Sequence, residues 1–253
     1  MSRSFTYPAL ALRVRPSGES NRDAWFLTSG EGVIRATVFG GPKSKLRAHI
    51  SPFHTGTLWI YHDPSKDSRK VTDFDVRSWR PGLRERYERS MAASSLAETV
   101  LATQGGGGNW DTALALANNA LDALDSADEA CCTRIVIHFL WNWALFLGIG
   151  PDLDRCAACA CEPSREGILW FSKREGVLLC PACADAQKRA ARDESLVPVM
   201  PGARRWLATV EKLPPAWLAR YMLDARSLAH AKALVTNLMA LALGRWLATW
   251  DVV

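Results

Sequence analysis

Two C-x-x-C pairs are the part of this sequence whose residue types and spacing could do chemistry. Cys156 and Cys159 form the first pair, and Cys180 and Cys183 form the second, twenty residues further along the chain. Zn²⁺ prefers a tetrahedron of soft ligands, and each C-x-x-C turn can present two thiolates to one ion. The chain has seven cysteines, an odd number that excludes complete internal pairing as disulfides. The pattern therefore predicts one zinc ion bound by four thiolates.

This zinc ion is predicted to be structural. Four thiolates close the coordination sphere and leave no position for a reactive water molecule. The deaminase pattern H-x-E is absent, as are G-x-S-x-G, H-E-x-x-H and a complete Walker A loop. We therefore expect a protein that is not an enzyme. Cys161 is an additional thiol two residues after the first pair, and the sequence leaves open whether it contributes to metal binding.

Positive charge is concentrated in the first third of the chain. Residues 1–80 contain 13 Lys and Arg against 7 Asp and Glu, a net charge of +6, whereas residues 81–253 contain 18 against 19. A charge asymmetry of this kind indicates a polyanionic partner, with nucleic acid as the leading candidate. The alternative is that the basic residues only keep a small domain soluble.

The basic region shows the pattern of a small β domain. Five short strands are expected at about 8–15, 24–28, 33–39, 57–61 and 70–77, separated by turns rich in Gly, Pro and Asp. Five such strands in about 75 residues suit a closed barrel of the OB-fold type. OB-fold barrels bind single strands with a cationic groove and stacking aromatic rings.

Six basic residues of this region are the candidate DNA-binding residues. Arg13 and Arg15 share one face of the first strand, and Arg35 lies on another strand. A second group is expected in the loop after Phe39. The six candidates are Arg13, Arg15, Arg35, Lys43, Lys45 and Arg47, and the possible stacking platforms are Trp25, Phe39, Phe53 and Trp59. Aromatic residues on alternating strands are also typical of a barrel core, so each platform has this second interpretation.

The rest of the chain is predicted to be mainly helical. Helices are expected at 83–104, 110–124, 128–147, 184–193, 201–212, 214–223 and 227–250, with 105–108 as a flexible glycine linker. The fold class is therefore α+β: an N-terminal OB-fold β barrel followed by an α-helical domain with an inserted four-cysteine zinc finger. The expected domains are 1–80 for the barrel, 81–150 together with 186–253 for the helical domain, and 151–185 for the zinc-binding knuckle.

The sequence also bears on location. No signal peptide is visible, and the longest apolar run, at 135–147, is shorter than the roughly 20 residues of a membrane-spanning helix. We expect a cytoplasmic protein with no membrane contact.

Taken in order, these segments resemble the RecO family of recombination mediators over nearly the whole chain. The strongest segments are LGIGPDLDRCAAC at 147–159 and EGVLLCPAC at 175–183. The barrel contributes ALRVRPSGES at 11–20, GVIRA at 32–36, KSKLR at 43–47 and SPF at 51–53. Ala160 departs from the family, which often has glycine after the second cysteine.

The resemblance implies a function in bacterial DNA repair and recombination. Family members bind single- and double-stranded DNA, anneal complementary strands, and help load the RecA recombinase onto DNA coated with single-stranded DNA-binding protein (SSB). The implied partners are RecR, the acidic C-terminal tail of SSB and possibly RecF, and the implied location is the bacterial nucleoid. Neither the position of the pocket for the SSB tail, nor the stoichiometry with RecR, nor the requirement for RecF follows from the residues.

Two alternatives come from other classes of protein. The chain could be a zinc-dependent enzyme that processes nucleic acid, or a transcriptional adaptor whose zinc knuckle contacts DNA. The knuckle carries no net charge between residues 155 and 185, with four basic and four acidic side chains, which disfavours the second alternative.

Overall fold

The computed structural model describes residues 3–40, 44–164, 166–191 and 195–252. The chain divides into two compact units, Met1–Ser126 and Ala127–Val253. The boundary places the helices before residue 127 in the same unit as the barrel. The sequence analysis instead expected one helical domain made of residues 81–150 and 186–253. Each unit is described by itself.

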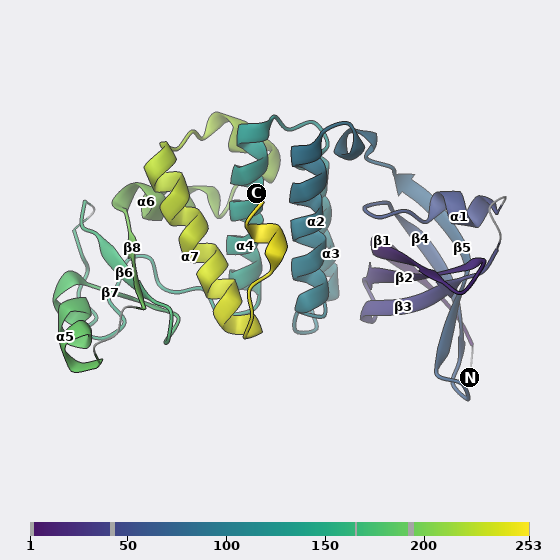
Figure 1. Ribbon diagram of the computed structural model, residues 1–253, viewed down its shortest axis with the longest axis horizontal. Coiled ribbons are helices and arrows are strands. Elements are labelled where there is room, and N and C mark those ends of the chain that lie inside the picture. The colour runs from purple at the N-terminus through teal and green to yellow at the C-terminus, as the bar shows by residue number, and fades with distance from the viewer. Residues whose placement is uncertain (1–2, 41–43, 165, 192–194, 253) are drawn as a thin grey trace. The chain divides into compact units, whose positions relative to one another are not determined.

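The N-terminal unit begins with a closed five-stranded barrel (Figure 1). Neighbouring strands follow the order β1-β2-β3-β5-β4, and the barrel closes because β1 also pairs with β4. All pairings are antiparallel except the one between β3 and β5. The strands are β1 (Ser4–Ser17), β2 (Asn21–Thr28), β3 (Gly32–Val38), β4 (Thr55–Asp63) and β5 (Ser68–Ser78). This OB-like barrel confirms the predicted fold class.

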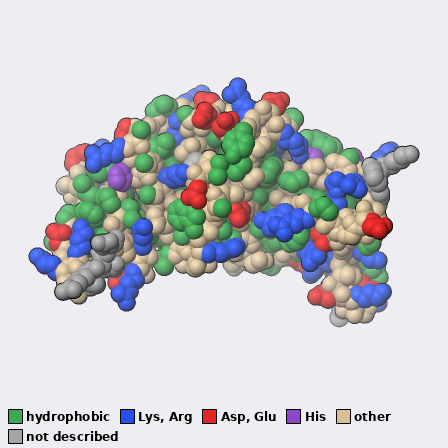
Figure 2. Space-filling model, viewed as in Figure 1, with side chains coloured by type: hydrophobic (Ala, Val, Ile, Leu, Met, Phe, Trp, Pro, Cys, Tyr) green, Lys and Arg blue, Asp and Glu red, His purple; other side chains and the backbone are tan. Residues whose placement is uncertain are grey.

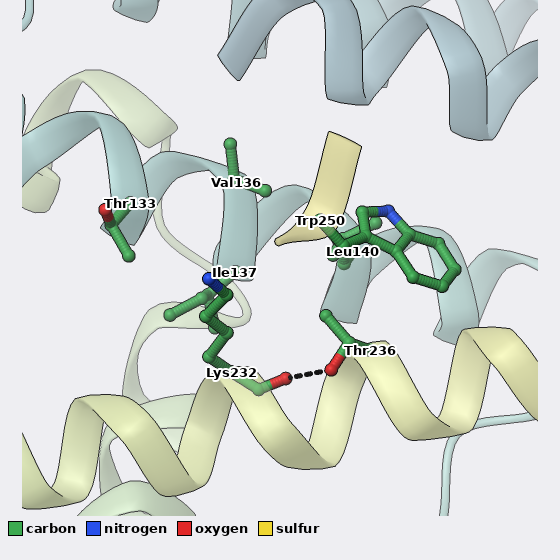
Figure 3. A pocket seen from close by; sticks show the side chains of 7 residues that line it. All are labelled: Thr133, Val136, Ile137, Leu140, Lys232, Thr236 and Trp250. Atoms are coloured by element: carbon green, nitrogen blue, oxygen red, sulfur yellow. Dashed lines mark hydrogen bonds between the residues drawn. The ribbon is translucent and has the colours of Figure 1, made fainter. Parts of the chain in front are cut away.

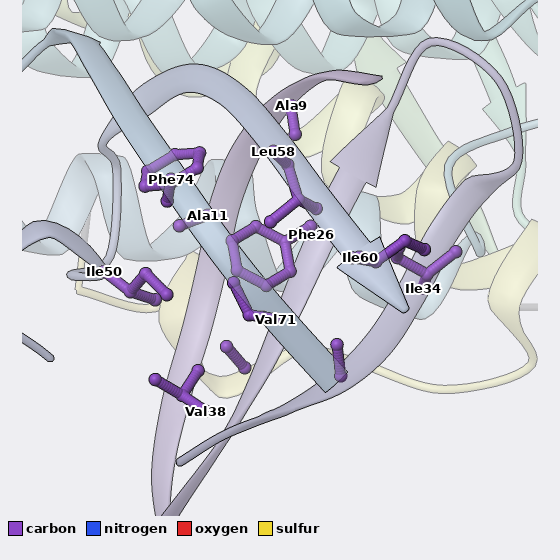
Figure 4. Close-up of a cluster of buried hydrophobic side chains, with 12 residues drawn as sticks. Ala9, Ala11, Phe26, Ile34, Val38, Ile50, Leu58, Ile60, Val71 and Phe74 are labelled. Atoms are coloured by element: carbon purple, nitrogen blue, oxygen red, sulfur yellow. The ribbon is translucent and has the colours of Figure 1, made fainter. Parts of the chain in front are cut away.

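Alternating side chains fill the barrel (Figure 4). Phe26 and Phe74 are fully buried at its centre, with ring centroids 5.7 Å apart. Small residues of β1, Ala9 and Ala11, leave room for these rings. Because strand side chains alternate between two faces, the residues between the core positions, such as Trp25, lie on the outside of the barrel.

A short helix, α1 (Lys45–His49), connects β3 to β4. The sequence analysis expected a loop over these residues, and that expectation was wrong. Ile50 follows the helix and is buried in the barrel core, so the helix is held against the barrel by its own C-terminal neighbour. The helix thereby fixes the direction of two of the candidate basic side chains.

The remainder of the N-terminal unit is helical. It contains the 3₁₀ helix η1 (Pro81–Arg84), α2 (Tyr87–Ala102) and α3 (Trp110–Leu124), and both α-helices contact β1. The sequence suggested the glycine run between them as a flexible linker; Gly107 and Gly108 are exposed, but Gly105 is packed against the barrel. Gly105 is buried with φ +76°, and a Cβ atom there would lie 2.9 Å from a methyl group of Leu27. This glycine therefore allows the helices to pack closely on the barrel.

The C-terminal unit is built around α4 (Glu129–Phe146), whose side chains are buried on almost every side. Its buried polar groups have partners: Arg134 Nε donates to the carbonyl of Leu218, and His138 Nε2 lies 3.1 and 3.0 Å from the carbonyls of Val210 and Leu213. The other helices are α5 (Pro181–Ala191), α6 (Pro201–Val210), η2 (Pro215–Arg220), α7 (Ala225–Leu243) and η3 (Ala248–Trp250).

A three-stranded sheet was only partly expected in this unit. The predicted hairpin is present as β6 (Leu169–Ser172) and β7 (Val177–Leu179), but β8 (Leu196–Val199) pairs with the other side of β6. Pro198 argues against a strand in sequence, yet it is tolerated because β8 is an edge strand. The last long helix also ends earlier than predicted, at Gly244, whose φ of +64° is the left-handed conformation that closes helices.

Across the described residues, each helix is either too short or too polar to traverse a lipid bilayer.

Arg80 links the barrel to α3 within the N-terminal unit, beside a direct bond from Thr55 Oγ1 to Asn118 Oδ1 at 2.6 Å. Its buried guanidinium donates to Asp122 Oδ1 at 2.7 Å, to the Phe53 carbonyl at 2.6 Å, to Thr55 Oγ1 at 2.8 Å and to Asn118 Oδ1 at 3.0 Å. Arg80→Ala should lower the free energy of unfolding by about 2–4 kcal/mol, because partly buried acceptors lose their donor. Urea denaturation measures this loss.

Arg77→Ala is the matched control, because Arg77 is an exposed arginine on the neighbouring strand β5. It should change the unfolding free energy by no more than about 0.5 kcal/mol. Equal effects of the two substitutions would contradict the role of Arg80 as a link.

Candidate metal centre and nucleic-acid surface

The backbone around the four predicted cysteines brings their thiols together. The first pair lies in a turn after α4, and the Ala157 amide donates to the Leu178 carbonyl at 2.9 Å, which ties this turn to β7. Cys180 follows β7, and Cys183 lies in the first turn of α5. The hairpin of β6 and β7 therefore returns the second pair to the first, as the spacing predicts.

The geometry of the four thiols fits a tetrahedral metal ion. The Sγ atoms of Cys156, Cys159, Cys180 and Cys183 all lie within 4.8 Å of one another, and the Cys159 and Cys180 sulfurs are 3.8 Å apart. With metal–sulfur bonds of about 2.3 Å, the edge of a tetrahedron is about 3.8 Å. Cys156 and Cys180 are buried and Cys159 is exposed, so the site lies at the edge of the unit. These four residues can hold a metal ion.

The electrostatics of the cluster favour a cation. Burial disfavours the Cys156 thiolate, but backbone amide donors, including Cys180 N at 3.3 Å from the sulfur, outweigh burial and lower the pKa of Cys156 to about 6. Hydrogen bonds from its thiol to Cys180 and Cys159 raise the pKa of Cys183 to about 12. Thiols so close together resist sharing negative charge, and a divalent ion removes that repulsion.

Cys161 is a fifth thiol beside the cluster. Its side chain is exposed, and hydrogen bonds to Cys159 and Cys180 raise its pKa to about 12. Its carbonyl accepts the Cys156 amide at 3.0 Å. Between these residues Ala160 has φ +56°, a left-handed conformation that costs a non-glycine residue about 1–2 kcal/mol. A glycine at this position would adopt the same conformation without that cost.

The strand cations of the predicted DNA surface lie around one tryptophan. In the barrel register, Arg13 of β1 and Arg35 of β3 are the two partners of Trp25 on β2, so the three side chains form a row across the outer face. The Arg35 guanidinium carbon lies 5.4 Å from the centroid of the Trp25 ring. Arg15 lies two residues further along β1 and is exposed. This row combines positive charge with an aromatic ring.

Arg35 is not a free cation, because it also pairs with Asp23. Burial alone would raise the pKa of Asp23, but hydrogen bonds from Arg35 and Thr37 outweigh it and lower that pKa. Asp23 therefore stays ionised and neutralises part of the charge. The Arg35 side chain is nevertheless 62% exposed, so it can still reach a ligand.

The second predicted group is only partly described. Lys43 lies outside the described residues, Lys45 is exposed on α1, and Arg47 is half-buried there. Arg22, which the sequence analysis missed, donates from Nη1 to the Arg47 carbonyl at 3.5 Å. Since Arg22 belongs to β2, it connects α1 to the strands that carry the first group. Figure 2 shows Lys and Arg side chains over the barrel with a few acidic ones among them.

Among the four predicted platforms, Phe39 is the most exposed, at 46%, with the Lys70 ammonium 5.3 Å from its ring centroid. Trp25, Phe53 and Trp59 are half-buried. The sequence analysis missed Trp79, which is equally exposed at 46%. The available signal was its position directly after the last barrel strand, next to Arg80 and two residues after Arg77.

Comparison with protein families decides the identity of the chain. The N-terminal model of recombination protein O matches residues 1–78, and the C-terminal model of the same protein matches residues 84–251. The chain belongs to the RecO family. Together the two matches cover both the barrel and the helices of this RecO-family chain.

Three relatives, each named DNA repair protein RecO, agree with this assignment. The protein of Rubrobacter xylanophilus is 30% identical over 233 residues, which is 88% of this chain and 90% of the relative. That of a Synechococcus strain is 26% identical over 73% of this chain and 64% of its own length. That of Desulfitobacterium hafniense is 31% identical over 69% of this chain and 63% of the relative.

The metal centre of this RecO-family chain leads to a test with an internal control. We expect the purified chain to hold one divalent ion, and Cys180→Ser to lose the ion and melt at a lower temperature, because metal binding contributes to folding. Elemental analysis and a thermal melt measure both effects. Cys161→Ser should retain one ion per chain, and loss of the ion from that variant instead would contradict the four-cysteine assignment.

Proposed function

We propose that this RecO-family chain is a non-enzymatic DNA repair and recombination mediator that binds single- and double-stranded DNA and anneals complementary strands. The observation that carries the proposal is the row of Arg13, Trp25 and Arg35 on the outer face of an OB-like barrel. Barrels of this class bind strands by combining a cationic surface with aromatic rings. The net charge of +6 in residues 1–80 supports a polyanionic ligand.

The chemistry of annealing needs neutralised phosphates and no bond-making group. Two strands repel each other through their phosphates, and a basic surface that contacts both strands reduces this repulsion. Arg13, Arg15 and Arg35 would contact one strand segment, and Lys45 and Arg47 on α1 would extend the surface. Lys43, the sixth candidate, lies outside the described residues. Bases remain available for pairing because the contacts go to the backbone.

We propose zinc as the ion of the metal centre, held by Cys156, Cys159, Cys180 and Cys183. Such an ion supplies rigidity when it is bound, because four thiolates leave no position for water. The cysteines tie the turn after α4 to β7 and to the start of α5. The centre would therefore stabilise the knuckle within the C-terminal unit, whereas the barrel binds DNA.

The proposed partners follow from the family. They are RecR, SSB through its acidic C-terminal tail, and possibly RecF, with help in loading recombinase onto SSB-coated DNA. The proposed location is the bacterial cytoplasm, at the nucleoid.

We propose a pocket of the C-terminal unit (Figure 3) as the contact site of the SSB tail. Its lining is mostly apolar and contains one lysine: Thr133, Val136, Ile137, Leu140, Lys232, Thr236 and Trp250. Burial lowers the pKa of Lys232, and the nearby Asp251 carboxylate acts in the opposite direction. The interior has room for little more than one water molecule, so an acidic peptide would contact the ammonium group and the apolar rim at the mouth of the pocket.

Salt dependence tests the DNA surface. The logarithm of the affinity for a single strand should fall with the logarithm of the salt concentration, with a slope of about 0.7 per phosphate contact. Arg13→Ala and Lys45→Ala should each reduce this slope by about 0.7, in fluorescence anisotropy titrations of a labelled oligonucleotide. Lys173→Ala is the control, because Lys173 is an exposed cation in the turn between β6 and β7. If the slope changed only in the control variant, the DNA-binding surface would lie on the knuckle and not on the barrel.

The pocket has a separate test. Lys232→Gln should weaken the binding of a synthetic peptide with the acidic SSB tail sequence by about tenfold, because one charge-assisted hydrogen bond is worth about 1.5–3 kcal/mol. Amidation of the peptide's terminal carboxylate should weaken binding to the native chain and have little further effect on the variant. Isothermal titration calorimetry measures both effects, with Lys212→Gln as an exposed control on the same unit. Undiminished binding by Lys232→Gln would exclude this pocket.

A further inference from the structure

Trp79 is a large aromatic side chain that the fold leaves partly outside the protein. It lies immediately after β5, and 46% of its surface is exposed. Its ring centroid is 4.8 Å from that of His54 and 5.6 Å from that of His49, and both contacts are T-shaped. The indole is therefore held on two sides while nearly half of its surface faces solvent.

The two histidines are themselves fixed by the backbone. His49 Nδ1 lies 3.3 Å from the Phe74 carbonyl, and His54 Nδ1 lies 2.7 Å from the His49 carbonyl. Carbonyl oxygens only accept hydrogen bonds, so each Nδ1 carries the hydrogen. A ring supported by two oriented neighbours loses little conformational entropy when a ligand binds to it. The Trp79 side chain is thus preorganised for binding a ligand.

Two cations are connected to this indole through its two histidine neighbours. Arg84 Nη2 donates to His54 Nε2 at 3.1 Å and to the Pro52 carbonyl at 3.3 Å, and the Arg84 side chain is exposed. On the other side, His49 belongs to the helix α1, which carries the exposed Lys45. The nearest acidic residues in sequence are Asp75, which is exposed on β5, and Glu85, which lies 3.8 Å from Arg89. An aromatic ring between cations is the arrangement that binds single-stranded nucleic acid.

We propose that Trp79 is a stacking platform for an unpaired base, with Arg84 and Lys45 contacting phosphates on either side. This inference rests on the proposed function, since it assumes that the barrel binds DNA. It adds that single-stranded DNA is bound at Trp79. A flat indole can stack only on a base whose face is free. Bases of a duplex are already stacked on their neighbours, so the platform distinguishes single strands from duplex.

Substitution of Trp79 in the full-length, metal-loaded chain tests the proposal. Trp79→Ala should weaken binding to a labelled oligothymidylate by about 5- to 150-fold, the range that corresponds to one lost base–aromatic stack. The slope of affinity against salt should stay the same, because no phosphate contact is lost. Affinity for a duplex of equal length should change by less than about twofold, and Trp79→Phe should retain most of the single-strand affinity.

Trp217→Ala is the matched control, because Trp217 is 49% exposed in the C-terminal unit and lies outside the proposed surface. It should bind both nucleic acids like the native chain. Arg84→Ala, in contrast, should reduce the salt slope by about 0.7.

A second measurement does not depend on the folding of a variant. An oligonucleotide with 5-iodouracil, irradiated with the native chain, should form a photo-crosslink that peptide mapping assigns to Trp79. If the native chain bound no single strand at low salt, the proposed function would fail first. If it bound, but Trp79→Ala lost equal affinity for single strand and duplex, or crosslinks mapped only to other residues, the platform would be excluded.

Discussion

The buried guanidinium of Arg80 is the interaction on which the proposed DNA-binding unit depends. It donates to groups on the loop before β4, on β4 itself and on α3, and every one of these acceptors belongs to the N-terminal unit. A buried cation is tolerated only when its donors are satisfied, so the four acceptors must keep their positions. The residue before it is Trp79, and the loop that it holds carries Phe53 and His54. The same bonds that join the barrel to its helices therefore also position the exposed indole.

The two units place different physical demands on the sequence. The barrel closes on itself and buries an apolar interior, so its outer face is free to carry charge and aromatic rings. The knuckle has only short strands, and Cys159 of its first C-x-x-C turn is exposed. A metal ion is an efficient way to stabilise such a segment. In the proposed function, this difference would let a bound metal ion stabilise the knuckle while the barrel contacts DNA.

Sequence patterns predicted the features that depend on local spacing. The five strands, the clustering of the four cysteines and the first helices followed from alternation, from C-x-x-C spacing and from glycine positions. Features that depend on tertiary contacts were missed. The strand β8 was missed because Pro198 disfavours a strand. Proline is tolerated at the edge of a sheet, and the sequence alone does not show that β8 is an edge strand. Arg22 and Trp79 were overlooked because charge and exposure at a barrel end are set by residues far away in sequence. Gly105 resembled a linker residue, although its packing against Leu27 is what requires glycine.

Amide hydrogen exchange of the metal-loaded chain, with and without a single-stranded oligonucleotide, tests the division of roles most directly. The account predicts that DNA protects amides of β1, β2, β3 and α1 and the segment around Trp79, while amides of the knuckle between residues 151 and 185 exchange at unchanged rates. Protection confined to the knuckle, with the barrel unaffected, would contradict the account.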